Sequence, residues 1–181
     1  FAPIEQRFEE GISRLIFALG RFFLPLTLVV GVVYVLSIPF NFWKPFEERD
    51  VLIIYNLMLF AVMGLLVFTT PVVTAGLSQP MQLWLRRGMV AVAVLAVLVS
   101  LYALSATAYR TWQGGFTINR VTIIGWNVIN IGILVHLVYT QARGGLELWL
   151  PSFWRTCRLG MIAYTVWALF VIVVMPWPLA A

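Results

Sequence analysis

Five long apolar runs, separated by short polar connections, take up most of this 181-residue chain. They cover residues 19–39, 51–70, 88–109, 121–140 and 159–175. A helix rises ~1.5 Å per residue, so each run is long enough to cross a hydrocarbon layer of ~30 Å. Charged residues are only 10% of the chain, whereas a soluble domain carries about 25%. The sequence predicts an all-α, polytopic membrane helical bundle with five transmembrane helices over residues 19–175, surrounded by the lipid bilayer.

Residues 1–18 have the pattern of an amphipathic helix ahead of the first run. Apolar side chains recur on one face and glutamates on the other: Ile4, Phe8, Ile12, Leu15, Ile16 and Leu19 against Glu5, Glu9 and Glu10. We expect a helix lying in the membrane interface, or alternatively a regulatory or partner-binding helix. The chain opens without Met, so we expect it to be part of a longer or processed protein. Residues 176–181 are predicted to form a short tail.

Basic residues predict how the bundle is oriented. Connections on one side carry eight of them (Arg7, Arg14, Arg21, Arg86, Arg87, Arg143, Arg155 and Arg158), and those on the other carry four (Lys44, Arg49, Arg110 and Arg120). The positive-inside rule then places the N-terminal helix in the cytoplasm and the C-terminus outside. Because these residues are scattered at the ends of spans, the net charge of +5 does not indicate nucleic acid as a partner.

The apolar runs hold few groups that do chemistry. No Asp, Glu, Lys or Arg lies deep in a run, which argues against ion-coupled transport within this chain alone. No nucleophile–base motif, phosphate-binding glycine loop or metal-ligand cluster is visible in the sequence, and the single Cys157 excludes an internal disulfide. We therefore expect no catalytic site. Six tryptophans fall in or beside predicted connections, as rings that favour the headgroup region do: Trp43, Trp84, Trp112, Trp149, Trp154 and Trp177.

The fourth run carries the polar and small residues that favour helix packing. Asn119, Asn127 and Asn130 lie along one stripe, and an amide in hydrocarbon seeks a partner on another helix. Gly125 and Gly132 lie on a second face, where a neighbouring helix can approach closely. We predict that these two faces are the main packing surfaces of the bundle.

His136 is the single histidine and follows Gly132 by one helical turn. An imidazole beside a small residue can ligate a haem iron or a chlorophyll magnesium. The alternative is a histidine near the cytoplasmic end that hydrogen-bonds a neighbour or a headgroup. The sequence does not identify a cofactor.

The connection before the fourth run, residues 109–120, is the most motif-like segment. A glycine pair permits a tight turn with positive φ, Thr117 or Asn119 can cap the next helix, and the flanking arginines can bind headgroup phosphates. The residues that we single out in this turn are Arg110, Gly114, Gly115, Thr117 and Arg120.

This turn resembles that of a bacterial multi-pass membrane family catalogued as domain of unknown function four-one-five-three. The shared Gly-x-Thr-x-x-Arg pattern matches at Gly115, Thr117 and Arg120, with Asn119 also in place. The resemblance extends to the Phe-Leu-Pro-Leu start of the first run (residues 23–26) and to the Pro-Trp ending of the last (residues 176–177). Gly114 and Phe116 depart from the pattern, which has an aromatic residue and Leu or Ile there. The resemblance implies a bacterial inner-membrane protein, and this chain as a C-terminal portion, but no activity.

Three function classes fit the sequence. The first is a non-catalytic subunit that packs with other membrane subunits in a larger assembly, and the absence of catalytic motifs and deep charges favours it. The second is a permease-like component that acts with further spans upstream. The third is a subunit of an electron-transfer or photosynthetic complex that holds haem or chlorophyll through His136.

Overall fold

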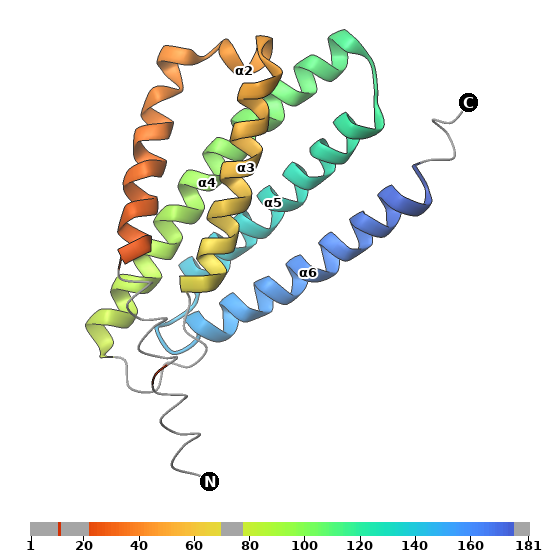
Figure 1. Cartoon of the computed structure of the whole chain (residues 1–181). Coiled ribbons are helices and arrows are strands. Elements are labelled where there is room, and N and C mark those ends of the chain that lie inside the picture. Colours follow the sequence, from red (N-terminus) through yellow and green to blue (C-terminus); the bar gives the residue numbers. More distant parts are fainter. Residues whose placement is uncertain (1–10, 12–21, 70–77, 176–181) are drawn as a thin grey trace.

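A computed structural model of the protein describes residue 11, residues 22–69 and residues 78–175. Every element within these residues is a helix, and none is a strand (Figure 1). The elements are the helix Phe22–Ser37, η1 (Pro39–Asn41), α2 (Lys44–Glu47), α3 (Arg49–Thr69), α4 (Gln79–Gly114), α5 (Ile118–Arg143) and α6 (Trp149–Val173). The predicted all-α fold is confirmed.

Four of these helices, α3, α4, α5 and α6, are long and apolar enough to cross a membrane. The helix Phe22–Ser37 is also apolar, but its described part is shorter than these four helices. The first three residues of the predicted run, 19–21, lie outside the described residues. The predicted amphipathic helix over residues 1–18, apart from Gly11, and the tail over 176–181 lie outside the described residues.

Two helices extend well beyond the apolar runs that predicted them. α4 begins at Gln79 rather than at residue 88 and ends at Gly114, and α6 begins at Trp149 rather than at residue 159. Hydropathy marks the part of a helix that suits hydrocarbon, but Gln and Arg are good helix formers, so the helix continues through them. Trp84 and Trp112, expected in or beside connections, are therefore helical.

The long helices alternate in direction, and α4 is the central one (Figure 1). It packs against α3 and, more extensively, against α5, whose contact with α6 completes the row. Half of the apolar stretch of α4 is buried in the protein, but only 11% of that of α6. In Figure 1 the C-terminal end of α6 leans away from the other helices, so α6 is the most exposed span.

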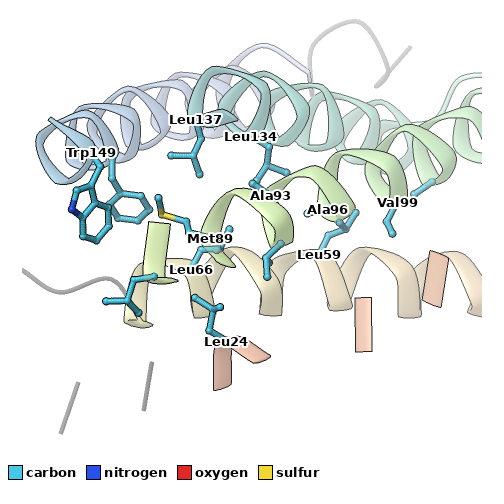
Figure 2. Packing of buried hydrophobic residues seen from close by; sticks show 14 of the residues in the cluster. Leu24, Leu59, Leu66, Met89, Ala93, Ala96, Val99, Leu134, Leu137 and Trp149 are labelled. Carbon is cyan, nitrogen blue, oxygen red and sulfur yellow. The ribbon is translucent and has the colours of Figure 1, made fainter. Parts of the chain in front are cut away.

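The core follows α4 on both sides (Figure 2). Ala93 and Ala96 of α4 are buried, and leucines of α3 and α5 pack around them from opposite sides. The buried residues of α5 lie three and four positions apart: Asn127, Asn130, Leu134, Leu137 and Gln141. This spacing is typical of the interlocking of coiled coils and of antiparallel bundles.

Candidate functional site

A cavity of about 640 Å³ lies where α3, α4 and α5 meet, at the end that holds the α4–α5 turn. Ligand pockets generally measure ~300–1,000 Å³. The lining combines a stripe of α3, the last turns of α4 and the start of α5, and it includes Arg110 and Arg120. Two arginines that the sequence places in one turn thus lie at one hollow of the structure.

The α3 wall of this cavity is apolar and outward-facing. Ile53, Leu57 and Phe60 line it and have exposed fractions of 50%, 69% and 46%. These three residues lie on successive turns of α3 and lead from its start at Arg49 into the apolar part of the helix. The wall is therefore accessible from the bilayer side.

Polar side chains from all three helices complete the lining of the cavity. Asn56 and Thr107 contribute from α3 and α4, and Thr117 and Asn119 from the start of α5. The carboxyl groups of the described residues do not line this cavity, whereas two guanidinium groups do. The site therefore joins apolar surface to a cationic, hydrogen-bonding end.

A second cavity, of about 630 Å³, adjoins the first and shares both arginines. Trp43, Tyr109 and Glu47 are among its lining residues, and Glu47 brings a carboxylate to this side. The two arginines therefore lie between an apolar hollow and a more polar one.

Arg110 is held by the short helix that precedes α3. Its Nη1 donates a hydrogen bond to the carbonyl oxygen of Glu47, the last residue of α2, at 3.2 Å. The last carbonyl groups of a helix lack partners within the helix and carry its partial negative charge. Arg110 thus ties the end of α2 to α4 and stays half-buried at the cavity.

Arg120 folds back from α5 over the end of α4. Its Nη1 donates to the carbonyl oxygens of Arg110 at 3.1 Å and of Gly115 at 2.8 Å. The guanidinium lies against Gly114, where an added Cβ would come within 2.6 Å of Nη1. Only glycine leaves room for the guanidinium in this position.

The remaining residues of the turn give it its shape. Gly115 follows α4 with φ of 78°, a left-handed conformation that favours glycine. Of the two candidate caps, the structure uses Thr117, whose hydroxyl accepts a hydrogen bond from the backbone N–H of Arg120 at 3.4 Å. Asn119, which we expected at a contact between helices, is exposed and lines the cavity.

Asn127 joins α5 to α3 next to the cavity, through a hydrogen bond to Asn56. It is fully buried, and its Nδ2 donates to Oδ1 of Asn56 at 2.9 Å and to the carbonyl oxygen of Ile123 at 3.1 Å. Asn56 in turn donates to the carbonyl oxygen of Leu52 at 2.9 Å. Asn56 also lines the cavity, so its hydrogen bond to Asn127 connects the cavity lining on α3 to α5.

The other packing residues expected on α5 divide into two groups. Asn130 is buried and accepts a hydrogen bond from the Tyr164 hydroxyl of α6. Gly125 lies beneath the Trp167 ring of α6, where an added Cβ would be 1.9 Å from Cζ2. Gly132, in contrast, is exposed and has nothing within 4 Å of such a Cβ among the described residues. Asn127, Asn130 and Gly125 are thus at contacts between helices, whereas Gly132 is on an outer face.

His136 is half-buried between α5 and α6. Its Nδ1 lies 3.0 Å from the hydroxyl of Thr156, which itself donates to the carbonyl oxygen of Ser152 at 2.9 Å. Because the Thr156 hydroxyl donates its proton to Ser152, its oxygen can accept a hydrogen bond from Nδ1 in the tautomer that carries the proton there. In that tautomer Nε2 has a lone pair, for which the described residues supply no partner.

Sequence reasoning missed the junction at the opposite end of the bundle. Arg86 of α4 donates to the carbonyl oxygens of Gln141 and Gly144, at the C-terminal end of α5. The buried Gln141 side chain donates to the carbonyl oxygen of Trp149, the first residue of α6, at 2.7 Å. The one sequence signal for Gln141 is the three- and four-residue spacing that begins at Asn127 and Asn130. Continued along α5, this spacing reaches position 141, which lies just beyond the predicted span.

The two arginines beside an apolar wall suit binding of an anion or an amphiphile. No group of three or more His, Cys, Asp or Glu side chains is placed to hold a metal ion in the part of the chain that the structure describes.

No protein-family model, curated protein or solved structure matches this chain.

Proposed function

We propose that this protein is an accessory subunit of a larger membrane assembly, without an active site of its own. The observation that carries the proposal is the uneven burial of its helices. Among the described helices α6 packs mainly on α5, and only 11% of its apolar stretch is buried. On the exposed side of α5, Gly132 leaves backbone uncovered among Val128 and Val135. Small residues on a membrane helix let another helix approach closely, so this face suits a partner subunit.

The test is to replace Gly132 by Leu and to follow the assembly. The full-length protein is purified from its native membrane in a mild detergent, and native mass spectrometry identifies proteins retained in constant ratio. We expect Gly132→Leu to lose the partner without loss of the fold, because nothing within the described residues is near this position. Gly64→Leu is the matched control, since an added Cβ at Gly64 of α3 also meets nothing within 4 Å among the described residues. A partner kept in Gly132→Leu, or a wild-type protein that purifies alone, contradicts the proposal.

The same proposal extends to topology, membrane and family. The helix Phe22–Ser37 is apolar, and residues before it belong to the first predicted run, which supports a fifth span. The excess of basic residues at the α4–α3 and α5–α6 end supports a cytoplasmic location for that end. The Gly-x-Thr-x-x-Arg turn supports membership of the family of unknown function four-one-five-three, and with it a bacterial inner membrane.

A second candidate function, holding a haem or chlorophyll, has its own observation. Histidines that bind a metal generally donate their other ring N–H to a neighbour, and the Thr156 hydroxyl oxygen, 3.0 Å from Nδ1 of His136, is placed to accept such a bond. Nε2 would be the ligand, and a cofactor would supply redox or light-absorbing chemistry. An absorption spectrum of the natively purified protein is the test. A Soret or chlorophyll band that disappears in His136→Ala supports this function, and a spectrum without such bands removes it.

A further inference from the structure

We propose that the cavity between α3, α4 and α5 binds an anionic phospholipid. The phosphate lies at Arg110 and Arg120, and one acyl chain follows the α3 wall past Ile53, Leu57 and Phe60. The inference is independent of the proposed role in an assembly, because it concerns a different face of the molecule.

The charge of the site selects an anion. Both arginines use Nη1 for their hydrogen bonds to backbone carbonyl groups within the described residues. Among the described residues these bonds tether each guanidinium, and Nη2 and Nε have no acceptor there, so they can donate to a ligand. Planar guanidinium groups with free donor pairs bind phosphate in a bidentate manner. No carboxylate of the described residues lines this cavity, and Glu47 lines the adjoining one.

The depth of the site selects a lipid. α4 rises ~1.5 Å per residue, so Arg110 lies about 35 Å along the helix from Arg87, close to the ~30 Å thickness of the hydrocarbon layer. Trp43 and Trp112 are exposed around this end of α4, as expected of residues at the headgroup level. With the arginines at that level, the apolar α3 wall extends ~10 Å inward from Ile53 to Phe60, at acyl-chain depth.

Gly114 positions one of the two arginines. A Cβ at this residue would come within 2.8 Å of Nη2 and 3.1 Å of Cζ of Arg120. The guanidinium is the far end of a flexible side chain, so Gly114→Ala moves it without forcing the helices apart. This variant therefore tests the placement of the charge with the charge itself retained.

The experiment titrates the purified full chain with lipids in native mass spectrometry. Phosphatidylglycerol and phosphatidylcholine with the same acyl chains are compared, and inorganic phosphate is added as a competitor. We expect the first phosphatidylglycerol to bind about tenfold tighter than phosphatidylcholine. Both lipids carry the phosphate, but the two guanidinium groups repel the choline ammonium of phosphatidylcholine, which also cancels its net negative charge. Arg110→Gln and Arg120→Gln should remove this preference, and Gly114→Ala should reduce it several-fold.

The controls leave the cavity intact. Arg87→Gln removes an exposed arginine at the other end of α4, and Gly132→Ala adds a methyl group in open space. Both should keep the preference. If an arginine variant fails to fold, Leu57→Trp at an exposed wall position tests the acyl-chain part by weakening both lipids.

Three results would overturn the proposal. The first is equal affinity for the two lipids, and the second is an unchanged preference in a folded Arg110→Gln protein. The third is displacement of phosphatidylglycerol by millimolar phosphate together with no effect of Leu57→Trp. That combination would identify a site for free phosphate.

Discussion

Arg86, Arg110 and Arg120 each donate hydrogen bonds to carbonyl oxygens at or just beyond the C-terminal end of a helix. The last four carbonyl groups of a helix have no partner within it, and near a bilayer water does not always replace one. A guanidinium satisfies several such oxygens and also complements the negative end of the helix dipole. Residues that mark topology in the sequence thus also hold helix ends together.

The Asn56–Asn127 pair is the residue-scale contact that we expect to stabilise the site most directly. In a double-mutant cycle with Asn56→Ala and Asn127→Ala, we expect a coupling energy of about 0.5–1.5 kcal/mol, typical of hydrogen bonds between membrane helices. Unfolding in mixed detergent micelles measures the four proteins. Strictly additive effects would mean that the hydrogen bond contributes nothing to stability.

Gly125 and Gly132 should respond to alanine with opposite signs. Gly125→Ala drives a methyl group into the Trp167 ring, so we expect a loss of about 1–3 kcal/mol in the free energy of unfolding. Gly132→Ala meets open space and should be neutral, or stabilising by up to ~1 kcal/mol through helix propensity. Thermal unfolding of the two variants side by side decides it. Equal effects would show that the Trp167 contact is not formed.

At the scale of elements, α4 organises the bundle through small side chains. Its buried face repeats at three- and four-residue intervals: Ala93, Ala96, Ser100, Ala103 and Thr107. Small residues let helix backbones come close, and in lipid close packing replaces the hydrophobic effect as the force between helices. α4 therefore meets its neighbours through this face, whereas Gly125 of α5 lies against α6.

Enlarging one residue of that face should separate the helices. Ala103 has no exposed surface, so Ala103→Leu inserts three heavy atoms into a filled contact, and we expect a loss of about 1–3 kcal/mol in unfolding free energy. Ala108→Leu, at an exposed position of the same helix, is the control and should cost little. A tolerated Ala103→Leu would indicate that this face is loosely packed.

At the scale of the whole molecule, the ends of the bundle differ in charge, and this difference predicts the side of the membrane that each end faces. In a Cys157→Ser background, we expect Gln113→Cys to react with a membrane-impermeant thiol reagent in intact cells. Glu147→Cys should react only after permeabilisation. Both replaced residues are exposed at opposite ends of the bundle, so accessibility reports topology. The reverse pattern would invert the orientation and place the Arg110–Arg120 site in the cytoplasm.

The sequence predicted elements better than it predicted their ends or their neighbours. Apolar runs located α3, α4, α5 and α6, but α4 continued for nine residues ahead of its run because Gln, Trp and Arg are compatible with a helix. The turn residues of the site were visible as a local motif. Its α3 wall was not, because nothing local to Ile53 or Asn56 signals that the start of α5 lies opposite.

The sequence by itself predicted four properties of the protein. They are its lipid surroundings, its helical fold, the alternating direction of its spans and the shape of the α4–α5 turn. These follow from length, hydropathy and glycine placement, which are local properties. The tertiary structure alone decided that α4 is central, that Asn127 pairs with Asn56, and that Gly125 is covered while Gly132 is open. The physical reason is that lipid accepts a Leu, Val or Ile face as readily as another helix does. Only shape and specific hydrogen bonds between distant residues select which faces meet.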